Sequence, residues 1–247
     1  MTAGKEKWDA RIGAIYISSS LTMEREWHIA LPDSVSFHIA RISLDGCDAT
    51  EQGLIDMLES GQVEEAARKL ASAGVDVIAF GCTAGSFIKG IEWDRKLSKR
   101  IEEVSGGIPA TTTSTGLIEA LRALDCKNVA LATPYLEEIN VKERAFLEGN
   151  GFNVVDLKGC HCLKDQDIAR VTPQQFIDLH KEMDVEESDC GFISCTNSRS
   201  IEAISVLEKE LGKPFLSSNQ VTLWSALKTI GYKGSIKGYG VLMESYL

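Results

Sequence analysis

Residues 75–83 read Val-Asp-Val-Ile-Ala-Phe-Gly-Cys-Thr, and residues 190–198 read Cys-Gly-Phe-Ile-Ser-Cys-Thr-Asn-Ser. Each stretch is an apolar run that reaches a cysteine, Cys82 or Cys195, and continues with threonine and small polar residues. A short apolar run of this kind indicates a buried β-strand, and a helical pattern begins just after each one. In an open α/β sheet, ligands bind outside the carboxyl ends of the strands. The two matching contexts therefore predict that Cys82 and Cys195 form a pair of opposed acid/base or nucleophilic groups.

The composition limits the class of protein. A chain of 247 residues with 44% hydrophobic residues is long enough for one large α/β domain or two ordinary ones. Its net charge of −10 argues against nucleic acid or an anionic membrane as a partner. The N-terminus has no secretory pattern and no apolar run could cross a bilayer, so we expect a cytoplasmic protein. Seven cysteines in a chain of this size indicate reduced thiols rather than a disulfide framework.

Strand and helix patterns alternate along the chain. Strands are expected at Arg11–Ser18, Ser36–Ser43, Val75–Gly81, Val129–Thr133, Phe152–Leu157, Cys190–Ser194 and Ser235–Val241. Helices are expected over Glu51–Ala73, Phe87–Val104, Leu117–Leu124, Leu136–Gly149, Pro173–Met183 with Thr172 as the N-cap, Ser198–Leu211 and Val221–Ile230. The alternation is typical of α/β proteins with parallel sheets.

The pattern also repeats at a larger scale. Gly107-Ile108-Pro109 leads into a helix and then a strand, and Gly212-Lys213-Pro214 does the same. Each of the two cysteine strands therefore belongs to a duplicated unit, which predicts two similar α/β lobes that face each other. The final unit would complete the first lobe. We expect an N-terminal lobe of residues 1–111 plus 218–247 and a C-terminal lobe of residues 112–217.

Five short segments carry a resemblance to a known family. They are Ser18–Glu24, Gly81–Thr83, Ala132–Tyr135, Ser194–Asn197 and Ser217–Gln220. With them the chain resembles the aspartate/glutamate racemase superfamily, in particular the branch of maleate cis–trans isomerase and arylmalonate decarboxylase. The resemblance covers essentially the whole chain. It implies two Rossmann-like (flavodoxin-like) lobes with parallel sheets, related by a pseudo-twofold axis, and an active site in the cleft between them.

The details of the motifs separate the branches. Two cysteines disfavour arylmalonate decarboxylase, which keeps only the second one, and Tyr135 after Thr-Pro favours this branch over the amino-acid racemases. The isomerases have an asparagine that helps to hold a substrate carboxylate where this chain has Ser20. Their other carboxylate-binding asparagine has no clear counterpart within Asp165-Gln166-Asp167. Both departures weaken the case for maleate itself as the substrate.

Proton transfer beside a carboxylate needs a poised base or nucleophile and donors aimed at the developing charge. A thiol meets the first need because its pKa of about 8.5 falls readily at a helix N-terminus. In the isomerase interpretation, the resemblance makes Cys82 the thiolate that adds to the alkene of a small dicarboxylate and Cys195 the proton donor. In the racemase interpretation, the two thiols flank one chiral carbon of an amino acid or hydantoin. Neither mechanism uses a cofactor. Substrate contacts are predicted for Ser20, Thr83, Ala84, Tyr135, Thr196 and Asn197.

A third hypothesis is a two-lobed binding protein for a small ligand, without catalysis, which would need no paired thiols. Cys160-His161-Cys162 is spaced too tightly for an ordinary zinc site, so no metal is expected. The chain has no glycine-rich nucleotide motif. The expected partner is a small carboxylate substrate, and related enzymes suggest a homodimer or larger assembly.

Overall fold

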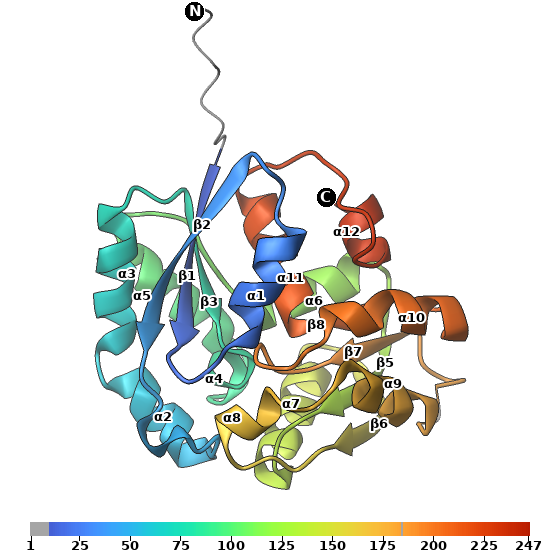
Figure 1. Ribbon diagram of the computed structural model, residues 1–247. Coiled ribbons are helices and arrows are strands. Elements are labelled where there is room, and N and C mark those ends of the chain that lie inside the picture. Colours follow the sequence, from blue (N-terminus) through green and yellow to red (C-terminus); the bar gives the residue numbers. More distant parts are fainter. Residues whose placement is uncertain (1–9, 184) are drawn as a thin grey trace, which may run out of the picture.

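Two parallel four-stranded sheets form the core of the computed structural model, which describes residues 10–183 and 185–247 apart from the side chain of Cys47 (Figure 1). In sheet order, the first contains β2 (Val35–Ile42), β1 (Ala10–Ile17), β3 (Val77–Gly81) and β4 (Ala110–Thr112). The second contains β6 (Asn153–Gly159), β5 (Asn128–Thr133), β7 (Cys190–Ile193) and β8 (Phe215–Ser217). The same strand order in both sheets confirms the predicted duplication of an α/β lobe.

The two cysteine strands, β3 and β7, lie at corresponding places in their sheets. Each pairs on both sides with a parallel neighbour, and every residue in both strands is buried. Strands that are covered on both faces need apolar residues throughout, which is why the sequence shows continuous runs rather than alternation. Both strands end one or two residues before the cysteine, as predicted.

Helices cover both sheets (Figure 1). In chain order they are α1 (Thr22–Ala30), α2 (Glu51–Glu59), α3 (Gln62–Ser72), α4 (Thr83–Phe87), α5 (Trp93–Val104), α6 (Thr113–Ala123), α7 (Glu137–Gly149), α8 (Asp165–Ile168), α9 (Pro173–Lys181), α10 (Ile201–Leu211), α11 (Ser218–Thr229) and α12 (Val241–Ser245), with a 3-10 turn at Asp45–Cys47. None of these helices has both the length and the apolar character needed to cross a bilayer.

Three expected elements differ from the structure. The helix expected over Phe87–Val104 begins only at Trp93, because Gly90 and Glu92 have φ values of +86° and +65° that a helix excludes. The helix expected over Glu51–Ala73 is interrupted between α2 and α3, because Gly61 adopts a φ of +82° that ends the helical path. The prediction of a strand at Ser235–Val241 is wrong, because this segment is a loop that leads into α12. Its glycines Gly238 and Gly240 have φ values of +87° and +86°, which a regular strand excludes.

Helix α11 connects the two halves of the molecule. It begins directly after β8 of the second sheet, yet it packs against β3 of the first sheet and against α6, the helix that follows β4 (Figure 1). Gly116 of α6 permits this close packing, because a Cβ atom there would lie 2.5 Å from the carbonyl oxygen of Val221. The crossing brings Ser218 to the carboxyl end of β3, where the Thr83 hydroxyl donates a hydrogen bond to the Ser218 hydroxyl at 2.8 Å.

Candidate active site

Cys82 lies where β3 ends and α4 begins. The residue is the N-cap of α4, and its Sγ accepts a hydrogen bond from the backbone N–H of Gly85 at 3.4 Å. The N–H groups of Thr83 and Ala84, the first two residues of α4, have no partner within the helix. The side chain of Cys82 therefore lies beside backbone donors.

Cys195 has the matching place after β7, and its backbone is unusual. Its φ is +80°, in the left-handed region, which costs a non-glycine residue about 1 to 3 kcal/mol. Its Sγ accepts a hydrogen bond from the N–H of Asn197 at 3.4 Å. The Thr196 side chain fixes the turn, because its hydroxyl donates to the carbonyl of Gly81 in the first sheet at 3.0 Å. The turn at Cys195 is thus held by contacts from both lobes.

Both thiols line one cavity between the carboxyl ends of the two sheets. The cavity is lined by Ile17, Ser20, Leu44, Ala49, Leu54, Cys82, Thr83, Ala84, Tyr135, Asp165, Ile168, Cys195 and Thr196. Its volume of about 30 Å³ has room for one or two water molecules. A small organic acid would enter only if the lobes, or the segment that contributes Leu44 to Leu54, moved apart.

The cavity brings together most of the residues predicted from the sequence, namely Ser20, Cys82, Thr83, Ala84, Tyr135, Cys195 and Thr196. Asn197, which was also predicted, does not line the cavity, because its side chain forms hydrogen bonds between the lobes. Its Oδ1 accepts the N–H groups of Leu21 and Thr22 at 2.9 and 3.3 Å, and its Nδ2 donates to the carbonyl of Asp165 at 2.7 Å. Asn197 therefore positions two sides of the cavity instead of pointing its amide into it.

Burial controls the acidity of the two thiols. It raises the pKa of Cys82 to about 12, although the Gly85 N–H acts in the opposite direction. Burial also raises the pKa of Cys195 well above its ordinary value, and the charge of Asp165 and the nearby Cys82 add to this rise. The expectation that a helix N-terminus favours the thiolate is thus wrong for this closed state, because desolvation outweighs the backbone donors.

Tyr135 lines the cavity, and its hydroxyl lies beside Cys195 and Ser194. The side chain is 2% exposed, and its oxygen makes no hydrogen bond of ordinary geometry to any described residue. Its ring packs edge-on against Phe87, with 6.5 Å between the ring centroids. The hydroxyl lies close enough to Cys195 to oppose the rise in the pKa of that thiol. A buried, unpaired hydroxyl beside a thiol is available to a ligand.

Sequence reasoning assigned no role to Asp165, which the structure places in the cavity. It is the first residue of α8 and is 6% exposed. The hydroxyls of Ser19 and Ser20 donate to its Oδ2 at 2.7 and 2.8 Å. The resemblance pointed to the segment Asp165-Gln166-Asp167 for a carboxylate-binding asparagine, but the segment is polar and without periodicity, so its own pattern did not single out Asp165.

Behind Cys195, Glu143 of α7 is a buried carboxyl group. Ser194 donates its hydroxyl to Glu143 Oε1 at 2.7 Å, while Oε2 has no partner among the described residues. Burial raises the pKa of Glu143 to about 8. The folded chain therefore holds a proton that the unfolded chain loses near the ordinary pKa of 4.5, so stability falls as the pH rises from there to about 8.

We expect Glu143→Gln to remove this pH-dependent loss of stability. The midpoint of thermal unfolding should nearly match the wild type near pH 5 and exceed it by roughly 10 °C near pH 8. Differential scanning calorimetry at both pH values checks this, with Glu148→Gln on the same helix as the exposed control. Equal destabilisation by Glu143→Gln at both pH values would contradict a protonated Glu143.

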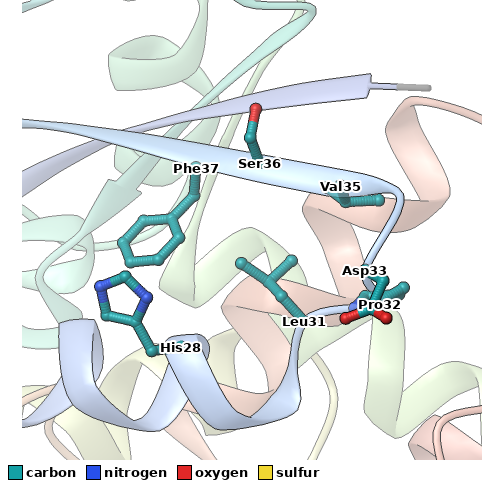
Figure 2. A pocket seen from close by; sticks show the side chains of 7 residues that line it. All are labelled: His28, Leu31, Pro32, Asp33, Val35, Ser36 and Phe37. Atoms are coloured by element: carbon teal, nitrogen blue, oxygen red, sulfur yellow. The ribbon is translucent and has the colours of Figure 1, made fainter. Parts of the chain in front are cut away.

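Other features of the surface do not extend the site. Figure 2 shows an open hollow between the end of α1 and the start of β2, where the rings of His28 and Phe37 lie with centroids 4.5 Å apart. None of the predicted site residues lines it. In the described part of the chain, no three His, Cys, Asp or Glu side chains are grouped so that they could hold a metal ion.

The fold and the paired thiols define a class of two-lobed α/β proteins with a cysteine at the carboxyl end of a central strand in each lobe. The sequence profile of the arylmalonate decarboxylase family matches residues 26–243, and the chain belongs to this family. It is 28% identical to the maleate isomerase of Nocardia farcinica over 243 residues, which cover 95% of either chain. It is 30% identical to the arylmalonate decarboxylase of Bordetella bronchiseptica over 198 residues, 79% of this chain and 81% of the relative.

A solved structure is similar over nearly the full length. It is a cysteine-to-serine mutant of the Nocardia farcinica maleate cis–trans isomerase with a covalently bound succinylcysteine intermediate. The two structures match with a TM-score of 0.90 at 26% identity, covering 96% of this chain and 99% of that one. The predicted branch of the superfamily is thereby confirmed.

Proposed function

We propose that this protein is a cysteine-based cis–trans isomerase of a small cis-butenedioic acid or a close derivative. The observation that carries the proposal is the pair of thiols, Cys82 and Cys195, which line one cavity from the matching strand ends of two lobes. The relatives support it, because several are maleate isomerases and the matching structure holds a succinylcysteine. No observation favours the racemase or the non-catalytic binding protein.

In the proposed mechanism, the Cys82 thiolate forms a bond to one alkene carbon. The π electrons move to the neighbouring carbon, which takes the proton of the Cys195 thiol. The central carbon–carbon bond is then single and turns. Cys195 next removes the proton again, the double bond reforms, and Cys82 leaves as thiolate. Both steps use only the two thiols, so the proposal includes no cofactor.

We assign substrate contacts to Ser20, Thr83, Ala84, Tyr135 and Thr196, with Asn197 as a positioning residue. The free N–H groups at the start of α4 suit a carboxylate of the substrate, and the Tyr135 hydroxyl is free to donate. The proposal also includes the expected lobe boundaries, between residues 111 and 112 and between residues 217 and 218. It further includes a homo-oligomeric assembly and a cytoplasmic location.

Incubation with maleate and with its half-amide, maleamate, tests the proposed activity. Proton NMR should show the trans isomer of at least one compound, and intact-protein mass spectrometry should show an adduct of matching mass. An absence of trans product and adduct with both compounds would refute the isomerase. D-amino-acid detection after incubation with L-amino acids would then examine the racemase.

The raised thiol pKa values predict a strong pH dependence. Below a pKa of about 12, the thiolate fraction of Cys82 increases tenfold for each unit of pH. We therefore expect log kcat/KM to rise with a slope near one between about pH 6 and pH 9. Initial rates in buffers of constant ionic strength check this. A plateau that begins below about pH 7 would mean that the free enzyme already holds the thiolate.

Replacing Tyr135 by Phe should lower kcat/KM by roughly 10- to 100-fold, through the loss of one hydrogen bond to a charged group. The midpoint of unfolding should change little, because the lost hydroxyl makes no hydrogen bond of ordinary geometry to a described residue. Tyr16→Phe is the matched control, since the Tyr16 hydroxyl donates to the carbonyl of Thr196 at 3.2 Å and its loss should cost stability. Unchanged kinetics in Tyr135→Phe would leave this residue a packing role only.

A further inference from the structure

The cavity contains one charged side chain, and it is negative. Of the residues that line the cavity, only Asp165 carries a formal charge when the thiols are protonated. Its Oδ2 accepts two hydroxyl hydrogen bonds, from Ser19 and Ser20. No described residue donates a hydrogen bond to its Oδ1, and this atom keeps some access to solvent although the residue is 6% exposed. The cavity lining therefore contains an acceptor that is open to a donor from water or from a ligand.

No Lys or Arg of the described chain forms an ion pair with Asp165. Arg41 contacts the serine turn, but its guanidinium binds other groups there. Its guanidinium donates to the backbone carbonyls of Ser18 and Ser20 at 3.2 and 2.9 Å and forms an ion pair with Glu24. Water can reach Oδ1 in the cavity, and a ligand that displaces this water leaves the carboxylate with a costly unmet acceptor unless the ligand brings a donor of its own.

The same arrangement disfavours a second carboxylate at this place. Two carboxylates in contact repel each other, and the repulsion is strong where water is excluded. The serine hydroxyls cannot offset it, because both already donate to Asp165. Thr83 and Ala84 also line the cavity, and as the first residues of α4 they bring backbone N–H groups and no acidic side chain. The cavity lining thus combines a carboxylate acceptor with backbone donors.

We propose that the substrate is a half-amide of a cis-butenedioic acid, with its carboxamide N–H donating to Asp165 Oδ1 and its single carboxylate at the backbone N–H groups of Thr83 and Ala84. The inference rests on the proposed function for the size and carbon frame of the ligand. It adds that Asp165 selects a monoanion with a donor over a dianion. A carboxamide suits this place because its NH₂ group offers two donors and no charge.

Saturated analogues measure this selection without turnover. Isothermal titration calorimetry of the wild type should give at least tenfold tighter binding of succinamate than of succinate, about the effect of one hydrogen bond to a charged group. In Asp165→Asn the preference should reverse, because the amide keeps an acceptor for the serines and offers a donor to a carboxylate. Asp167→Asn is the matched control, since it makes the same change on the same short helix at a half-exposed residue paired with Arg170.

The outcomes separate this inference from the proposed activity. Succinate binding as tightly as succinamate in the wild type would overturn the inference, whatever the variants do. A preference that Asp165→Asn leaves unchanged would also overturn it. Failure of the wild type to bind either analogue at millimolar concentration would remove both proposals. A preference for succinamate together with no isomerisation of maleamate or maleate would refute the isomerase alone.

Discussion

Replacing Cys82 by Ser should abolish isomerisation and any covalent adduct, with a fall in kcat of at least about 10⁴-fold. A serine hydroxyl is a poor nucleophile unless a base takes its proton. Intact-protein mass spectrometry after incubation with maleate and maleamate measures the adduct, and proton NMR measures turnover.

The matched control for this substitution is Cys126→Ser. Cys126 is a free thiol that is 3% exposed and lies outside the cavity, so its loss tests the general effect of exchanging a buried cysteine. We expect Cys126→Ser to retain both adduct and turnover. An adduct that persists in Cys82→Ser and disappears when Cys195 is replaced would reverse the roles of the two thiols.

The sequence predicts the position of both thiols because the signal is local. A strand that is buried on both faces must be apolar throughout, so β3 and β7 appear as short runs with abrupt ends. Parallel strands in an α/β lobe place such ends at the ligand-binding edge of the sheet. The repeat then adds the expectation that the two edges face each other. Cys82 and Cys195 could therefore be paired without any knowledge of their separation.

The acidity of the thiols and the role of Asp165 could not be predicted in this way. The pKa of Cys82 depends on how completely the two lobes exclude water, which is a property of the packed structure. Asp165 reaches the cavity because Asn197 binds its backbone carbonyl and Ser19 and Ser20 bind its side chain, across more than 140 positions of sequence from the serines. Contacts of that range leave no periodic pattern.

The errors in the fold have the same origin. In the sequence, Gly61 lies within an apolar pattern that fits one continuous helix. In the structure, its φ of +82° separates α2 from α3. Apolar and polar residues alternate over residues 235–241 as in a strand, but this segment pairs with no strand of the two described sheets. Instead, the carboxylate of Glu208 accepts the N–H of Val241 at 3.1 Å and fixes the start of α12. Contacts with the rest of the fold decide whether such a segment forms a strand, because its local pattern alone stabilises a strand little.

Replacing Cys195 by Ser should give the opposite result to Cys82→Ser, because the adduct should form and then persist. Addition by Cys82 remains possible, whereas a hydroxyl exchanges the substrate proton far more slowly than a thiol. We expect turnover to fall by about 10²- to 10⁴-fold, the usual contribution of a general acid or base. Mass spectrometry over time should show an adduct whose lifetime is much longer than in the wild type.

The strained backbone at Cys195 offers a second variant that separates chemistry from conformation. Its φ of +80° is unfavourable for serine and free of strain for glycine, so Cys195→Gly removes the proton donor while it relaxes the turn. If the persistent adduct comes from the missing proton, it should accumulate in both variants, and Cys195→Gly should also unfold at a temperature no lower than that of Cys195→Ser. An adduct in the serine variant alone would mean that the conformation of the turn controls its release. Rapid turnover by either variant would show that Cys195 is not the group that moves the proton.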